Sequence, residues 1–194
     1  MLMDLIAAER GALADVLGKL DAGQWRAPSL CTGWTVSHVV AHLTMPFRIS
    51  EQEFTDAMRR AGGRFTVVSD EIAERDSRLP PAQLADALRD NVHTNWSPPG
   101  GGLAGALSHD VIHGLDIARP LGIQYPIPDA ALTTVLDLLT GPEHAGADGA
   151  NPFGFRLDGR RLSATDLDWS AGSGETVAAP AGDLVLLAAG RRLP

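Results

Sequence analysis

The chain has 194 residues, of which 44% are hydrophobic and 21% charged, so it is long enough for one domain with an ordinary core. Its formal net charge of -8 argues against nucleic-acid binding, because an acidic surface repels phosphate backbones. A single cysteine excludes an intramolecular disulfide and a cysteine-based zinc site. With no long apolar run and no signal-peptide pattern, we expect a cytoplasmic protein without a membrane partner.

The N-terminal region is predicted to be helical. Apolar residues at three- and four-residue steps predict an amphipathic helix over residues 3–20, which Asp21 and the two residues after it close. Residues 27–35 are predicted to form a loop. Thr35, at the end of this loop, is a candidate N-cap for a second helix.

Prolines divide the helical pattern that follows. The second helix is expected to pass Pro46 with a kink and to continue toward Arg60. A third helical region covers residues 66–95 and is interrupted at Pro80-Pro81. Because proline is favourable at the first position of a helix, a separate helix should start there and run to residue 95.

The second half begins with a glycine-rich loop at residues 97–102. Two further helices are predicted, one over residues 103–119 and one over residues 129–140. Residues 141–152 are rich in glycine and alanine and indicate a linker or loop. We therefore expect a helical bundle over residues 1–145.

The C-terminal residues 150–194 have a different pattern, which predicts a small α+β segment. Residues 155–162 alternate around Asp158-Gly159, a dipeptide that favours a β-hairpin. Trp169 and the Thr176-Val177 pair lie on either side of a glycine-rich turn, and residues 183–190 are short, apolar and predicted to be helical.

Four of the six histidines stand in pairs four residues apart, His38 with His42 and His109 with His113. On a helix such residues share a face, with Cβ atoms about 5–6 Å apart. Two imidazoles so placed can ligate one divalent ion, and a third ligand from another helix would leave a position open for substrate. The spacing also fits surface pairs or core histidines bonded to carbonyl groups, so both interpretations stay open.

The neighbours of the histidines favour burial. The helix with His109 and His113 carries several apolar residues, and buried imidazoles need partners, of which a metal would be one. His42, next to Val39 and Leu43, lies nearer to the expected inner face than His38.

Three further polar side chains accompany the histidines. Asp116, three residues after His113, is a candidate to orient a ligand imidazole by a hydrogen bond to the nitrogen that does not bind the metal. Its alternative role is a helix cap or an ion pair. Asp110 is expected on a different helix face from the histidine pair. Cys31 is interpreted as a loop or core thiol and not as the nucleophile.

Three segments resemble a known family. Residues 31–43, Cys-Thr-Gly-Trp-Thr-Val-Ser-His-Val-Val-Ala-His-Leu, resemble the second-helix signature of the mycothiol-dependent maleylpyruvate isomerase family, in the DinB-like superfamily. Residues 109–116, His-Asp-Val-Ile-His-Gly-Leu-Asp, resemble its later motif of a ligand, three residues, His, two residues and Asp. Residues 164–169 resemble the start of its C-terminal region.

This resemblance implies a mainly α protein, a DinB-like four-helix bundle with a short C-terminal α+β segment. It also implies a divalent metal on His42, His109 and His113, with zinc in first place and nickel as the alternative, and mycothiol as a thiol co-substrate. The isomerases of the family carry Glu where this chain has His109. A three-histidine set resembles the wider superfamily and makes the site one charge more positive.

The function expected from the resemblance is that of a metal-dependent thiol S-transferase or isomerase, in which a thiolate attacks a small electrophile. Its partners would be the small-molecule thiol and the electrophile, and a bundle of this size is compatible with a homodimer. Two alternatives stay open: a DinB-like metalloprotein with chemistry that uses no thiol, and a non-catalytic helical bundle with a structural or regulatory role. No catalytic residue is assigned.

Overall fold

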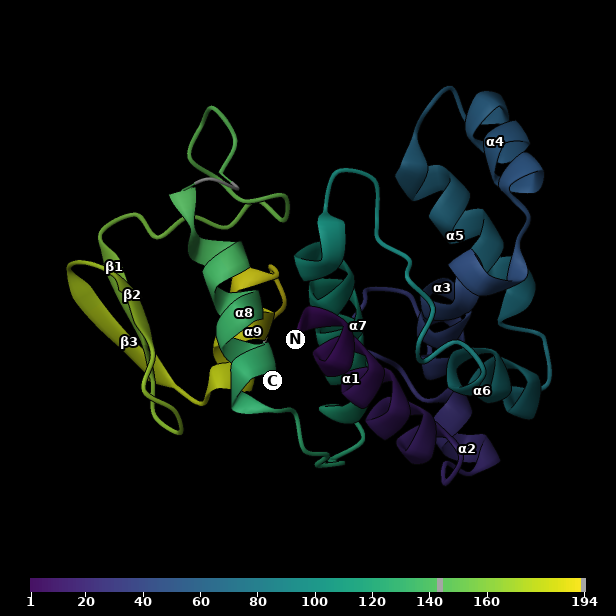
Figure 1. Cartoon of the computed structure of the whole chain (residues 1–194), viewed down its shortest axis with the longest axis horizontal. Helices are drawn as coiled ribbons and strands as arrows, with labels where there is room; N and C mark the ends of the chain where they lie inside the picture. The colour runs from purple at the N-terminus through teal and green to yellow at the C-terminus, as the bar shows by residue number, and fades with distance from the viewer. Residues whose placement is uncertain (143–144, 193–194) are drawn as a thin grey trace. The chain divides into compact units, whose positions relative to one another are not determined.

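A computed structural model describes residues 1–142 and 145–192 of the chain (Figure 1). In this part of the chain the fold is mainly helical, with nine α-helices and one three-stranded sheet near the C-terminus, which confirms the predicted fold class. Residues 143–144, inside the predicted linker 141–152, lie outside the described part. None of the described helices is long and apolar enough to cross a membrane.

Contacts divide the chain into two compact units. The central unit comprises residues 10–96 and 116–125, and the terminal unit comprises residues 1–9, 97–115 and 126–194. The predicted division of the chain into residues 1–145 and 150–194 stays a prediction.

The central unit contains most of the short helices. Its elements are the C-terminal part of α1 (Leu2–Leu17), then α2 (Ala22–Arg26), α3 (Val36–Arg48), α4 (Glu51–Arg60), α5 (Phe65–Asp76) and α6 (Pro81–Arg89). Both α5 and α6 pack against α3. The core between these helices is built from aliphatic side chains and one tryptophan, among them Leu13, Leu17, Trp25, Val36, Val39, Val40, Leu43, Leu84 and Leu88.

The local signals of the first half explain where its helices begin. Asp21, expected only to close the first helix, is the N-cap of α2 and accepts hydrogen bonds from the backbone N–H groups of Gly23 and Gln24. Thr35 is the N-cap of α3, as predicted. Pro81 occupies the first turn of α6, as its position in the sequence indicates.

Two helices end earlier than the sequence pattern predicts. The expected helix from Thr35 to Arg60 is divided into α3 and α4, because the Ser50 hydroxyl accepts the Glu53 N–H and starts a new helix soon after Pro46. The helix expected to reach residue 95 ends at Arg89. The turn beyond it is held instead by the buried guanidinium of Arg10, whose Nη1 donates to the Asn91 and Thr94 carbonyls.

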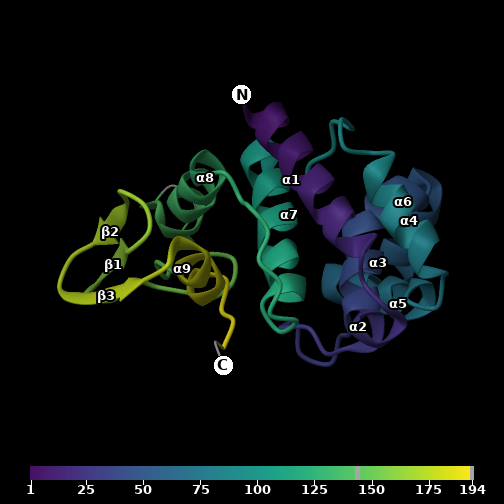
Figure 2. The ribbon, with the colours of Figure 1, turned by 90° about the horizontal axis from the view of Figure 1, so that it is seen from below.

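The terminal unit contains most of α7 (Gly102–Ala118), together with α8 (Asp129–Thr140) and α9 (Ala181–Ala188). The strands β1 (Arg160–Ala164), β2 (Ser170–Gly172) and β3 (Glu175–Ala179) form a sheet in the order β2-β1-β3. Helices α8 and α9 pack together and against this sheet (Figure 2).

The side chain of Asn151 connects the ends of these two helices. Its Nδ2 donates to the carbonyls of Leu139 in α8 and Ala188 in α9, at 3.0 and 2.8 Å. Its Oδ1 accepts the N–H groups of Phe153 and Phe155. One buried amide therefore satisfies carbonyls that the two helix ends cannot pair internally.

The predicted hairpin over residues 155–162 is wrong, although its turn is present. Asp158 and Gly159 both have positive φ, and the Arg160 N–H bonds to the Leu157 carbonyl across the turn. The backbone N–H and carbonyl of Phe155, however, bond to Asn151, so this segment does not pair with β1. The partners of β1 are β2, antiparallel, and β3, parallel.

The connection from β2 to β3 crosses the start of β1 within two residues. This brings its backbone onto the segment that enters β1, and both ends of the crossing are glycines with positive φ. A Cβ atom on Gly174 would lie 1.9 Å from the Gly159 carbonyl oxygen, and one on Gly172 would lie 2.3 Å from that of Arg160. Only glycine can make this crossing without moving the strand.

Candidate metal centre

His42 lies in the central unit, buried on α3 with 7% of its surface exposed. The Ser69 hydroxyl on α5 is 2.9 Å from its Nδ1 atom. The Trp34 ring packs against the imidazole with centroids 5.4 Å apart and a tilt of 54°. One ring nitrogen is thus hydrogen-bonded within the protein, an arrangement typical of a metal-ligating histidine.

His38, the other histidine of this pair, has a different role. Its Nδ1 lies 2.7 Å from the Thr35 hydroxyl at the start of α3, and its Nε2 lies 3.0 Å from the exposed carboxylate of Glu74. Hydrogen bonds from His38 and Arg78, and the charge of Arg78, hold the pKa of Glu74 below its usual value. His38 therefore stabilises the start of α3, which agrees with the choice of His42 as the ligand candidate.

His109 and His113 lie on α7 in the terminal unit, as their spacing predicts. Their ring centroids are 5.0 Å apart and the rings are nearly perpendicular, at 84°. Oδ1 of Asp110 is 3.4 Å from Nδ1 of His109, and Asp110 is buried. Asp110 was predicted to lie on a different helix face from the histidine pair, but its side chain reaches the ring of His109, the residue before it.

Asp116 and Cys31 meet in the central unit. The Cys31 thiol is 3.1 Å from Oδ2 of the fully buried Asp116, and the Leu30 N–H donates to the Asp116 carbonyl at 3.0 Å. The loop before α3 is thereby attached to the C-terminal turn of α7. The predicted role of Asp116 behind a ligand imidazole stays a prediction.

Two groups of three side chains among the described residues could hold a metal ion. One consists of His42, His109 and His113, and the other of Cys31, His113 and Asp116. The first has the composition of the predicted ligand set, and its three neutral imidazoles suit zinc or nickel. His113 belongs to both groups, so the two ligand sets exclude each other.

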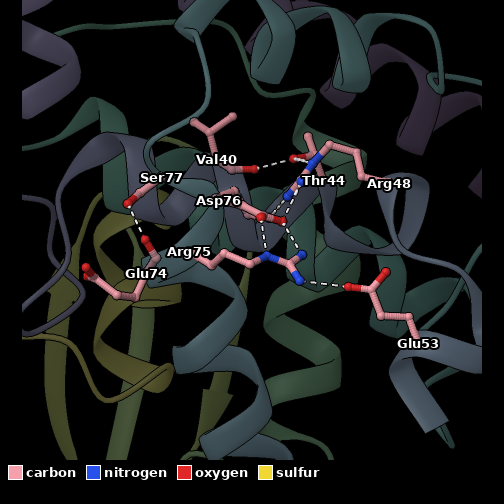
Figure 3. A network of polar contacts seen from close by, with 9 residues as sticks. Val40, Thr44, Arg48, Glu53, Glu74, Arg75, Asp76 and Ser77 are labelled. Atoms are coloured by element: carbon pink, nitrogen blue, oxygen red, sulfur yellow. Dashed lines mark hydrogen bonds and ion pairs between the residues drawn. The ribbon is translucent and has the colours of Figure 1, made fainter. Parts of the chain in front are cut away.

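A network of charged side chains connects α3, α4 and α5 (Figure 3). Nη1 of Arg48 is 2.5 Å from Oδ2 of Asp76, and Arg75 donates both to Asp76 and to Glu53. Arg48 also donates to the Thr44 hydroxyl and to the carbonyl of Ala41, the residue before His42. The network ties the end of α5 to the helix that carries the ligand candidate.

The charges of this network shift its pKa values. Burial raises the pKa of Asp76, but hydrogen bonds from Arg75 and Arg48, and the charges of both arginines, outweigh this and leave it below its usual value. Hydrogen bonds to Asp76 and Glu53 raise the pKa of Arg75. Both shifts favour the charged forms of Asp76 and Arg75.

Sequence reasoning missed Ser69 and the Arg48–Asp76 pair. Ser69 occupies a buried position of α5, next to Val68 and three residues before Ile72. A polar residue on an otherwise apolar helix face is the signal that could have indicated it. Its partner could not be read from the sequence, because 27 residues separate it from His42.

The comparison with solved structures identifies the fold. The chain is similar to the crystal structure of a mycothiol-dependent maleylpyruvate isomerase, with a TM-score of 0.64, 19% sequence identity, and coverage of 98% of this chain and 88% of that one. An alanine mutant of the same isomerase gives a TM-score of 0.64 at 18% identity, with the same coverage. The class of fold is therefore that of this isomerase.

Sequence comparison finds a family model that matches the first half of the chain. Residues 6–94 match the family model of the mycothiol maleylpyruvate isomerase N-terminal domain, which confirms the predicted resemblance. His42 and Ser69 lie inside the matched segment, whereas His109 and His113 lie beyond it. An uncharacterized protein of Mycobacterium tuberculosis, found in strains CDC 1551 / Oshkosh and H37Rv, is 26% identical over 145 residues. The match covers 62% of this chain and 56% of the relative.

Proposed function

We propose that the chain is a divalent-metal-dependent enzyme that transfers a low-molecular-weight thiol, mycothiol, to a small electrophile or uses it to isomerise one. The proposal depends on the burial and the contacts of three histidines. The His42 ring is buried and hydrogen-bonded through Nδ1, and two more imidazoles stand together on α7. The matched domain and the similar isomerase structures support thiol chemistry as the use of such a site.

The ligands in this proposal are His42, His109 and His113. Three neutral nitrogen donors satisfy three positions of a tetrahedral zinc ion, the number found in catalytic zinc sites. When bound, the metal would supply Lewis acidity, which favours the thiolate form of a coordinated thiol. Zinc is the expected metal and nickel the alternative.

The side chains behind the ligands would hold their orientation. Asp110 lies beside Nδ1 of His109, and Ser69 beside Nδ1 of His42. The Trp34 ring packs against the imidazole of His42. In a transfer, the sulfur would form a bond to the electrophilic carbon while a leaving group departs with its electron pair, and the thiol proton would balance the charge of that group. In an isomerisation, the sulfur would add to a carbon–carbon double bond and break its π bond. After rotation about the resulting single bond, elimination would break the carbon–sulfur bond, restore the double bond and return the thiol with its proton.

Metal analysis of purified, untagged protein tests the ligand set. We expect about one zinc or nickel ion per chain in wild type and little in His113→Ala. His113 occurs in both candidate groups, so two further variants separate them. His42→Ala should lose the metal, whereas Cys31→Ser should retain it. Loss in Cys31→Ser alone would assign the metal to the second group, and no metal in wild type after zinc addition would refute the proposal.

Thiol dependence is tested on the metal-loaded protein. Turnover of maleylpyruvate, or of a reactive electrophile such as monochlorobimane, should require mycothiol and should be lost in His42→Ala. Equal turnover without any thiol would identify a metalloprotein of different chemistry. This experiment separates failure of the thiol assignment from failure of the metal site.

A further inference from the structure

We infer that Ser69 is a positioning residue, which fixes the imidazole of His42 so that Nε2 is the nitrogen presented to the metal. The inference rests on the proposed function and adds a residue to it. Ser69 and His42 come from α5 and α3, two helices of the central unit that pack together. Their Oγ and Nδ1 atoms are 2.9 Å apart, and only 5% and 7% of their surfaces are exposed.

The hydrogen bond restricts which nitrogen can ligate. An imidazole that coordinates through Nε2 carries its proton on Nδ1, which must then donate to an acceptor. The Ser69 hydroxyl oxygen can accept this proton at the observed distance. Ligation through Nδ1 would instead require the imidazole to give up its buried hydrogen bond to Ser69. The contact therefore selects Nε2 as the ligand atom.

Two neighbouring features keep this contact in place. The Trp34 ring packs against the imidazole and limits its rotation about χ2. Asp76 lies seven residues after Ser69, two turns along the same face of α5, and pairs with Arg48 on α3. Arg48 in turn donates to the carbonyl of Ala41, the residue before His42. The Arg48–Asp76 pair thus holds α3 and α5 together on the face of α5 that carries Ser69.

Metal affinity tests the inference without depending on catalysis. Competition of the protein with a chromophoric chelator for Zn²⁺ or Co²⁺ gives the dissociation constant. We expect Ser69→Ala to raise it about 10–100-fold, the range found when the hydrogen-bond partner of a ligand is removed. Ser69→Thr retains a hydroxyl and should recover part of this loss.

Ser77→Ala, at the C-cap of the same helix, is the matched control. The Ser77 hydroxyl donates to the Glu74 carbonyl in an exposed hydrogen bond that involves no histidine, so the affinity of this variant should match wild type. Thermal unfolding of the metal-free proteins separates positioning from folding. Metal-free Ser69→Ala should melt cooperatively and near wild type, while its metal-loaded form should gain less stability than loaded wild type does.

Nitrogen-15 NMR of the histidine rings gives a readout that a merely structural serine would not change. In zinc-loaded wild type, His42 should carry its proton on Nδ1. A proton on Nε2, or equal metal affinity in Ser69→Ala and wild type, would overturn the inference while leaving the proposed function intact. If wild type itself binds no metal, the proposed function fails first and the inference fails with it.

Discussion

Arg48 at the end of α3 and Asp76 at the end of α5 form an ion pair in which neither side chain is more than 12% exposed. Such a pair gains little over an apolar contact when intact, but loss of one partner leaves a buried charge without compensation. Removal of one partner should therefore weaken the packing of α3 and α5, the helices that carry His42 and Ser69.

Asp76→Asn should destabilise the protein strongly. We expect the free energy of unfolding to fall by about 3–5 kcal/mol, because the Arg48 guanidinium would remain buried beside a neutral amide. Urea denaturation followed by circular dichroism measures the change. Asp56→Asn is the control, since Asp56 pairs with Arg59 at an exposed position and should contribute at most about 0.5 kcal/mol. Similar losses in both variants would contradict the assignment.

The stability that Asp76 contributes should depend on pH in a defined direction. Its pKa is lowered in the folded state, so its contribution is complete above the unfolded pKa of about 3.9 and is lost as pH falls through the folded pKa. The difference in stability between wild type and Asp76→Asn should be constant from about pH 5 to pH 8 and should shrink below about pH 4. A difference that instead grows toward low pH would show the opposite shift.

Substitution of Asn151 should loosen the C-terminal part of the terminal unit. In Asn151→Ala the Leu139 and Ala188 carbonyls and two backbone N–H groups lose their partner, with an expected loss of about 2–4 kcal/mol. Asn151→Asp retains the acceptor but turns a negative charge toward two helix C-termini, so it should be no more stable than the alanine variant. Calorimetry measures both, and Asn95→Ala, at an exposed site, should change stability by less than about 0.5 kcal/mol.

Replacement of His109 tests the feature in which this chain departs from the isomerases it resembles. His109→Glu supplies an oxygen ligand and should retain about one zinc per chain, whereas His109→Ala should bind zinc at least about 10-fold more weakly. The chelator competition assay measures both. If the two variants bind zinc equally well, His109 is not a ligand.

The helices with local signals were predicted well from the sequence. The limits of α8 agree with the prediction because a proline precedes it and glycine follows it, and α3 begins after Thr35 for the same kind of local reason. The hairpin failed because Asn151, a residue outside the predicted strands, takes the hydrogen bonds of Phe155. A side chain that competes for backbone groups leaves no periodic trace in the sequence.

The candidate site also has one part that the sequence predicts and one part that it does not. The pair His109 and His113 follows from helix spacing alone, and its ring contact agrees with that spacing. The partners of the imidazoles do not follow from spacing. Asp110 reaches His109 through its rotamer, and Ser69 reaches His42 across the packing of two helices. Both depend on tertiary structure that no single segment encodes.

The crossing from β2 to β3 affects how variation among relatives should be interpreted. At position 174 any side chain would collide with the Gly159 carbonyl, so in a randomised library only glycine codons should survive selection for a folded chain. A glycine that never changes there would reflect the steric demand of the crossing and would carry no information about substrate or thiol. Searches for catalytic residues by invariance should therefore exclude positions 172 and 174 before they rank the rest of the C-terminal segment.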